Sequence, residues 1–449
     1  MLRTFLNAWK QPDLRRKMLY VVFILLLYRV GTVIPVPFID AQTFASTFQG
    51  TVLDLVNTLS GGALGQATLF ALGISPYITA SIVIQLLTVA IPKLGELSKR
   101  GEEGKKILNN ITRYVTVVLA LVTAIGYYLM LKNGGALVYQ TGNTFFRAVV
   151  IVACYCAGAS LVMWLAEKIN ENGLGNGISL ILFAGIVSSL PNTFINLYQV
   201  IAAAIGGKEG AIIALAIIFV VLFVIVMLAM LVFCVFVTGS ERRIPVQYAK
   251  RVVGRKMYGG QSTHLPLKLN MSGVMPVIFA SSIVSLPATI MMFCGVNGSK
   301  ETFWDGFYNF MSPNGWFYPL IFAVLIIAFS YFYVQISFDP LEVSNNLKKN
   351  GGMIPGIRQG RPTQDYIARV LRRVTLMGAF FLMIIAVLPI IASPLVIQRV
   401  LTAVNLSPSL ASSFQFGGTS LLIVIGVALE TVRDLEAQLT MRNYKGFLN

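Results

Sequence analysis

The chain has 449 residues, of which 56% are hydrophobic and only 12% are charged, and its mean hydropathy is +0.75. Soluble domains carry about 25% charged residues, so this composition excludes a soluble globular enzyme and indicates a membrane protein with many spans. The 35 Lys and Arg outnumber the 18 Asp and Glu and give a net charge of +17, while four Cys and one His argue against a metal or thiol catalyst.

Ten apolar stretches are long enough to cross a bilayer as helices, because a crossing needs about 20 mostly apolar residues. They are centred on residues 18–36, 73–91, 113–132, 146–167, 178–205, 211–238, 273–295, 316–337, 374–398 and 415–432. The first stretch contains Arg29, whose side chain either snorkels to the membrane interface or faces the protein interior. We do not expect this stretch to be a cleavable signal, since it is too long and is followed by Pro35-Val36-Pro37.

The uncharged region that leads into the second span is too long for a single crossing. Residues 55–92 carry no charge over 38 positions, and Gly61, Gly62 and Gly65 interrupt the helical pattern. Residues 55–72 therefore form either a short outer helix in a vestibule or a re-entrant loop. Non-helical backbone at membrane depth must be surrounded by protein or water, so this segment predicts an internal cavity open to the outside.

The distribution of positive charge predicts the orientation in the membrane. If the N-terminus is cytoplasmic, 29 of the 35 Lys and Arg residues fall on the cytoplasmic side and five on the opposite side. Cytoplasmic loops carry such an excess, so we expect a multi-pass protein of the cytoplasmic membrane with both termini inside. Division into two five-span halves, residues 1–205 and 206–449, would invert the second half relative to the first and place a functional pathway between them.

Two long basic loops lie in the second half, at residues 239–272 and 338–373, with net charges of +6 and +4. Charge alone fits a topology signal or contact with anionic lipid. The second loop also contains the turn-rich, partly apolar sequence Gly351–Arg358, which a topology signal does not need. A structured basic loop suits RNA phosphate or an acidic protein partner.

No catalytic constellation is visible in the sequence. We expect His264 to have a surface or turn role and the four Cys to be inert core residues. The run Gly173–Gly177 lacks the GxxxxGK[ST] pattern and is interpreted as a tight turn before the fifth span. A secondary transporter remains an alternative, but it needs a mid-membrane carboxylate that spans two to nine do not offer. An intramembrane enzyme would need a paired nucleophile and base, so we predict neither an enzyme nor a cofactor.

The sequence resembles the SecY family, the central subunits of bacterial protein-conducting channels, over essentially its whole length. The matching strings occur in one order, and together they are highly specific. They are SGGAL (60–64), FALGISPYI (70–78), GNGIS (175–179), RRIP (242–245), YAKR (248–251), QSTHLPLK (261–268), NLKK (346–349), IPGIR (354–358) and FGGTSLLI (416–423).

The resemblance implies an all-α polytopic fold of ten transmembrane helices, in two inverted halves that form an hourglass pore with a plug. It implies a gated, passive channel that passes secretory polypeptides across the membrane and releases membrane helices sideways into it. It also implies SecE and SecG as membrane partners, with the SecA motor ATPase or the ribosome docking on the basic loops.

The family's functional positions are carried over string by string. A ring of aliphatic side chains would constrict the pore, and its members here are Ile74, Ile78, Ile178, Leu182, Ile278 and Ile423. The plug corresponds to about residues 55–66, with Leu59, Ser60, Gly61, Gly62, Ala63 and Leu64 at its centre. The docking residues are Arg242, Arg243, Lys250, Arg251, Arg255, Lys348, Lys349 and Arg358.

The family opens sideways between its second and seventh spans. The polar residues on these two spans, some of which we expect to bridge the closed gate, are Thr79, Gln85, Ser281 and Ser282. Each could instead bond its own helix backbone. Pro76 and Pro276 are expected to loosen helix geometry in the same spans.

Overall fold

The computed structural model describes most of the chain. The described residues are 6, 8–41, 43–44, 57, 60–138, 144–206, 210–248, 251–253, 256–258, 262–296, 303–312, 315, 317–403 and 418–445. The helices are α2 (Pro12–Gly31), α5 (Ser75–Ala90), α6 (Pro92–Lys99), α7 (Glu102–Asn133), α8 (Thr144–Asn172), α9 (Gly177–Gly206), α10 (Gly210–Gly239), α11 (Met275–Phe293), α12 (Phe303–Met311), α13 (Phe317–Ser337), α14 (Pro340–Lys349), α15 (Arg361–Ala392), the π-helix η1 (Ser393–Ile397), α16 (Gln398–Ala403) and α18 (Thr419–Lys445).

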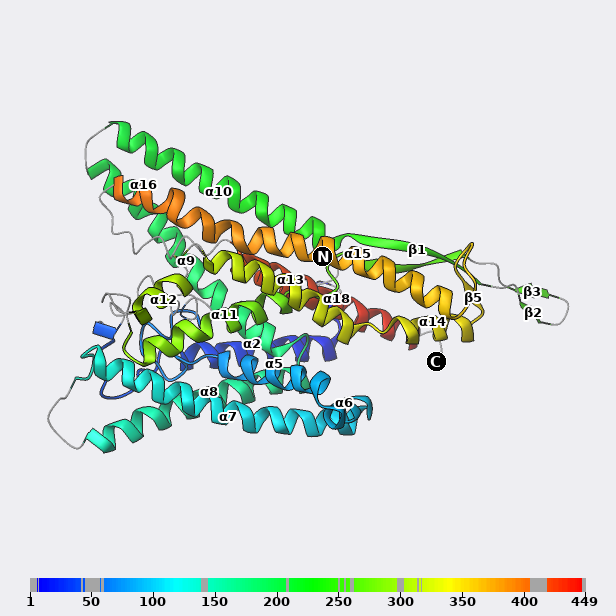
Figure 1. Ribbon diagram of the computed structural model, residues 1–449, viewed down its shortest axis with the longest axis horizontal. Coiled ribbons are helices and arrows are strands. Elements are labelled where there is room, and N and C mark those ends of the chain that lie inside the picture. Colours follow the sequence, from blue (N-terminus) through cyan, green and yellow to red (C-terminus); the bar gives the residue numbers. More distant parts are fainter. Residues whose placement is uncertain are drawn as a thin grey trace.

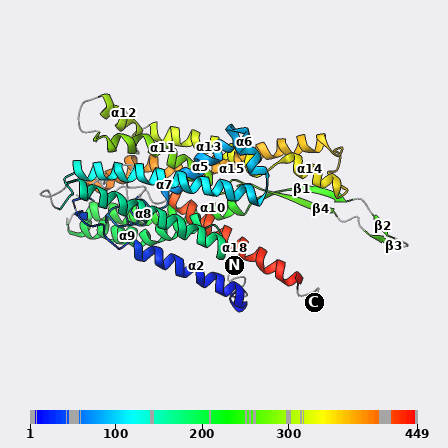
Figure 2. The same cartoon turned by 90° about the horizontal axis from the view of Figure 1, so that it is seen from below.

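The long helices run side by side in an elongated bundle (Figures 1 and 2). Each of the ten predicted spans overlaps one of them, namely α2, α5, α7, α8, α9, α10, α11, α13, α15 and α18. Among the described residues, seven helices are long and apolar enough to cross a membrane, or eight if α5 and α6, bent by 108°, form one span. The chain is therefore an all-α, multi-pass membrane protein.

Several helix ends differ from the predicted spans. Helix α2 ends at Gly31, before Pro35, whereas the predicted span continued to residue 36. Helix α7 begins at Glu102 and α15 at Arg361, well before the apolar stretches begin, and α18 continues to Lys445. Hydropathy reports the membrane-buried part of a helix, whereas backbone hydrogen bonding continues the helix into charged sequence beyond it.

Two buried apolar clusters divide the bundle along its length. The first, which we call the waist cluster, takes side chains from α2, α5, α8, α9, α10, α11, α13, α15 and α18, together with Phe70 and Ile74. The second lies among α7, α8, the C-terminal half of α11, α12 and the segment between α2 and α5, and includes Leu64, Ala71 and Leu72. Residues 60–74 contribute side chains to both clusters and form successive turns in place of a helix.

A small β-structure extends beyond one end of the helical bundle (Figures 1 and 2). Its strands are β1 (Glu241–Tyr248), β2 (Arg251–Val253), β3 (Lys256–Tyr258), β4 (Ser262–Lys268) and β5 (Gly352–Met353). Strand β1 pairs antiparallel with β4 and with β5, so one sheet joins the two basic loops. Strands β2 and β3 form a separate hairpin at the tip.

Apolar residues from both loops hold this structure together. Its buried members are Ile244, Val246, Leu267, Leu347, Ile354 and Ile367. They come from β1, β4, α14, the turn after β5, and α15. We refer to β1, β4, β5, α14 and residues 354–360 as the basic platform.

Candidate functional site

All six predicted ring residues lie in or against the waist cluster. Five of them are buried, with exposed fractions of 2–6%, and Ile178 is partly buried against the same cluster. They come from helices far apart in the sequence: α5 and the residue before it, α9, α11 and α18. The bundle therefore brings aliphatic side chains from its first five and its last five long helices into one buried cluster.

Local helix geometry explains why two of these helices each place two ring residues on the same face. Ile74 and Ile78 are four residues apart, as are Ile178 and Leu182, so each pair lies on one face. Pro76 is in the first turn of α5 and Pro276 in the first turn of α11. Proline is tolerated there because its missing N–H has no intrahelical partner. The expectation that these two prolines loosen the spans is therefore wrong; they begin the helices.

The described part of the predicted plug is packed against α2 and α9. Ser60, Ala63 and Leu64 are buried. The Tyr28 hydroxyl donates to the Ser60 carbonyl at 3.3 Å, and Nη1 of Arg29 to the Gly61 carbonyl at 3.5 Å. Arg29 thus faces the protein interior, one of the two alternatives left open by its position. Leu59 lies outside the described residues.

Gly61 sits where no side chain fits. Its φ is +71°, and a Cβ there would lie 2.5 Å from Oγ of Ser188 and 3.0 Å from the Gly185 carbonyl oxygen, both on α9. The turn is also held by Asn57, whose backbone carbonyl accepts from Gly62 N and whose Oδ1 accepts from Gly65 N, both at 2.8 Å. The glycines of this segment therefore serve close packing and a left-handed turn.

A polar cavity of about 420 Å³ opens on the platform side of the ring. Its apolar lining includes the ring residue Ile278, and its polar lining includes Asn176, Lys268 and Asn270. Burial, reinforced by nearby Arg433, lowers the pKa of Lys268. The cavity thus extends from the platform to the waist cluster.

Helices α5 and α11, which carry the predicted gate residues, are in contact. Among the described residues, the hydrogen bonds of the four gate side chains stay within their own helices. Thr79 donates to the Ser75 carbonyl, Gln85 to the Ser81 hydroxyl, and both Ser281 and Ser282 to the Ile278 carbonyl. In this structure these hydroxyls satisfy their own backbone, as the alternative interpretation of the sequence allowed.

Five of the eight predicted docking residues lie on the basic platform. Arg242, Arg243, Lys348, Lys349 and Arg358 are exposed, and Arg243 Nε bonds Glu241 Oε1 at 2.7 Å. The backbone of Arg251 lies in β2, whereas Lys250 and Arg255 lie outside the described residues.

The turn that carries Arg358 is held on both sides. Gln359 Nε2 donates to the Gly352 carbonyl at 3.1 Å, and Thr363 Oγ1 donates to the Arg358 carbonyl at 2.8 Å. Next to it, Ile357 packs against the platform cluster. The guanidinium therefore projects from a fixed backbone.

The run Gly173–Gly177 is the tight turn that the sequence indicated. Gly175 has φ +76°, and its N–H donates to Oδ2 of Asp434 at 3.0 Å. The N–H of Gly177 donates to Oδ1 of Asn170 at 2.7 Å. Sequence reasoning missed Asp434, because an acidic residue on an exposed helical tail gives no signal of a partner 259 residues earlier.

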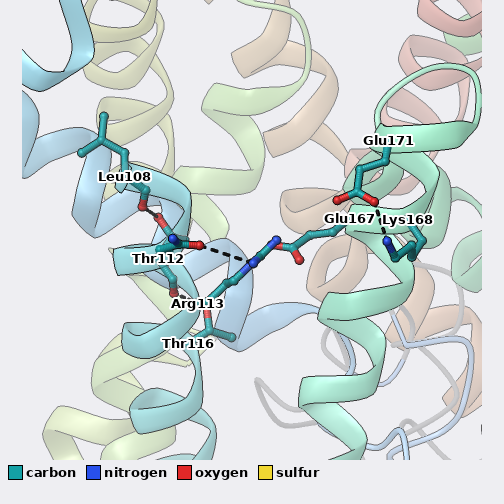
Figure 3. A network of polar contacts seen from close by, with 8 residues as sticks. Leu108, Thr112, Arg113, Thr116, Glu167, Lys168 and Glu171 are labelled. Carbon is teal, nitrogen blue, oxygen red and sulfur yellow. Dashed lines mark hydrogen bonds and ion pairs between the residues drawn. The ribbon is translucent and has the colours of Figure 1, made fainter. Parts of the chain in front are cut away.

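An ion pair between α7 and α8 was also missed (Figure 3). Nε of Arg113 lies 2.7 Å from Oε1 of Glu167, and the next residue of α8, Lys168, bonds Glu171 one turn further along. The Arg113 side chain is 43% exposed, so the pair contributes about 0–1 kcal/mol. Only the antiparallel packing of the two helices shows that these charges meet.

Comparison with known proteins agrees with this arrangement. The SecY family model matches residues 68–432. The protein translocase subunits SecY of Streptomyces galbus and Bacillus subtilis (strain 168) are each 43% identical to the chain, with 100% of both sequences covered.

Solved channels share the fold. The structure of a protein-conducting channel superposes with a TM-score of 0.59 at 17% identity, covering 93% of this chain and 92% of that one. A SecY structure, in which the plug domain stabilises the closed channel and maintains a membrane seal, gives 0.61 at 17% identity, covering 94% and 91%. With a family match over most of its length and relatives 43% identical from end to end, this chain belongs to the SecY family.

Proposed function

We propose that this chain is the pore-forming subunit of a protein translocase, a passive and gated channel for unfolded polypeptides. The observation that carries the proposal is that all six aliphatic ring residues, from both halves of the chain, lie in or against the waist cluster. The pathway runs between two halves, residues 1–205 and 206–449, through that ring. Signal sequences and membrane helices leave sideways between α5 and α11, which carry Thr79, Gln85, Ser281 and Ser282.

The ring suits such a pathway for a physical reason. Branched apolar side chains cannot replace the hydration shell of an ion, so a narrow aliphatic constriction excludes ions by dewetting. The same side chains form no specific hydrogen bonds, so they do not retain a passing chain of arbitrary sequence. The ring can therefore seal around many substrates, while the turns at residues 60–66 cover it as a plug when the channel is at rest.

The basic platform is the docking site for the energy source. Its exposed cations lie at one end of the bundle, where acidic protein surfaces or RNA phosphates can reach them. We assign that end to the cytoplasm, with both termini on the same side of the cytoplasmic membrane, because the excess of Lys and Arg lies there. The proposed partners are SecE and SecG in the membrane, and the motor SecA or the ribosome on the platform.

The proposal is tested by charge reversal at Arg358, with Arg361→Glu as a matched control on the same loop. Both side chains are exposed, but Arg361 begins α15 and is not a predicted docking residue. Motor-driven transport of a preprotein into sealed vesicles, measured by protease protection, should fall at least about tenfold for Arg358→Glu, as for a hot-spot residue.

The control should transport at nearly the wild-type rate, and both variants should insert normally into the membrane. Normal transport by Arg358→Glu would refute the docking assignment. An equal loss in both variants would show that net charge acts, and not a specific contact.

A further inference from the structure

Arg29 is a partly buried cation at the end of the apolar run 18–28 of α2, and neither the ring nor the platform explains it. Its Nη1 lies 3.5 Å from the Gly61 carbonyl oxygen, and its neighbour Tyr28, which is 1% exposed, donates its hydroxyl to the Ser60 carbonyl at 3.3 Å. Two successive side chains of α2 thus bond two successive carbonyls of the predicted plug. The sequence alone could not decide which way Arg29 points.

The two donors are held in place by packing around the last turn of α2. The ring of Tyr28 stacks on Phe70 with centroids 5.9 Å apart. Phe70 reaches this position only because residue 31 is glycine, since a Cβ there would lie 1.9 Å from the Phe70 ring. Thr32 closes the turn by donating Oγ1 to the Arg29 carbonyl at 2.7 Å. The orientation of both side chains is therefore fixed by packing within the bundle, independently of their contact with the plug.

The receiving backbone is equally confined. A Cβ on Gly61 would lie 2.8 Å from Nη1 of Arg29 and 2.5 Å from Oγ of Ser188 on α9. The Gly61 backbone is thus gripped between α2 and α9, with its carbonyl turned toward the guanidinium. Tyr28 and Arg29 can donate to these main-chain carbonyls only when the plug is in its closed position. The hydrogen bonds do not depend on which side chains the plug carries.

Resting on the proposed function, we propose that Tyr28 and Arg29 form a latch that holds the plug in its closed position. The pair are positioning residues: they touch the plug and not the passing substrate. A hydrogen bond to a neutral carbonyl is weaker than a buried ion pair, so the latch can be released. When the plug leaves, the Arg29 guanidinium loses the Gly61 carbonyl and exchanges that hydrogen bond for one to water, which makes opening reversible.

The latch is tested at rest, without any motor. The reporter is Ser60→Cys in a background in which the four native cysteines are replaced, and the reagent is a membrane-impermeant maleimide added from the side opposite the platform. The channel is reconstituted with its membrane partners in vesicles, and resting ion leak is recorded on the same preparation. The variants are Arg29→Met, Tyr28→Phe and Arg29→Lys.

We expect Arg29→Met to raise the labelling rate and the leak about tenfold, and Tyr28→Phe about fivefold, as the loss of a charged and of a neutral hydrogen bond implies. Arg29→Lys keeps a cationic donor and should return both readings toward wild type. Two controls on the same helix, Tyr20→Phe and the exposed Val30→Met, should leave both unchanged.

Unchanged labelling and leak in both Arg29→Met and Tyr28→Phe would overturn the latch and leave Arg29 as a snorkelling side chain. An increase that Arg29→Lys does not reverse would also overturn it, because the cation would then have no role. Failure of the proposed function looks different: the unsubstituted channel would not transport a preprotein at all, whatever the resting readings show.

Discussion

The waist cluster and the basic platform both have apolar interiors. Without their packing, the side chains of the platform would be exposed to water, whereas those of the waist would be exposed to lipid. The platform stands beyond the end of the bundle, and its six buried side chains, among them Ile244 and Leu267, are removed from water when the sheet forms. Burial of such a side chain contributes about 1.5–3 kcal/mol. The hydrophobic effect therefore accounts for the apolar interior of the platform.

The same argument fails at the waist. Lipid tails are as apolar as Leu or Ile, so burial between membrane helices has no hydrophobic driving force relative to lipid. Membrane helix contacts usually use small residues, whereas Ile78, Ile278 and Ile423 are branched and bulky. The comparison teaches that the hydrophobic effect explains the aliphatic residues of the platform but not those of the waist, and we propose that the ring residues are aliphatic to exclude water and ions from a pathway.

The strongest way to break this comparison is to make both regions polar. Ile78→Ser with Ile278→Ser should raise the resting ion conductance of reconstituted channels on the order of tenfold or more, because a hydroxyl-lined constriction wets. Ile244→Ser should destabilise the platform and leave the resting conductance at the wild-type level. Conductance that is unchanged at the ring, or raised equally at the platform, would contradict the distinction.

A smaller effect should come from separating the two loops of the platform. A Cβ at Gly352 would lie 3.1 Å from Tyr248 and 3.3 Å from both Leu347 and Val246. Gly352→Val should therefore push β5 from β1 and displace the Arg358 turn, which bonds the Gly352 carbonyl through Gln359. A substitution of this kind usually lowers the free energy of unfolding by about 0.5–3 kcal/mol. We therefore expect motor-driven transport to fall about fivefold.

The matched control for that experiment is Gly356→Val. Gly356 lies four residues beyond Gly352, and a Cβ there meets nothing within 4 Å, although its φ of +80°, unlike that of Gly352, is strained for valine. An equal loss of transport in both variants would assign the effect to a disturbed turn at Arg358, and not to the joining of the two loops.

The positions of the long helices were predictable from the sequence, because an uncharged stretch of about 20 residues is a local pattern. The aliphatic ring positions came only from the resemblance to the SecY family, because an aliphatic residue in a span gives no local sign that it lines a ring. The helix ends were not predictable, since α7, α15 and α18 continue into charged sequence. Tyr28 was missed, because a tyrosine in an apolar span gives no sign that it donates to a carbonyl 32 residues away. The gate hydroxyls bond their own helices, and sequence alone left that choice open.

The central claim is that the six aliphatic residues surround the path of the substrate, and site-specific crosslinking tests it most directly. A photoreactive amino acid is placed at Ile278 or, as a control on the same helix, at Ile290, which is 57% exposed on the bundle surface. A preprotein stalled halfway through the channel should crosslink to position 278, and equally to positions 78, 178 and 423, but not to position 290. Crosslinking at position 290 with none at 278 would show that the polypeptide does not pass through the waist.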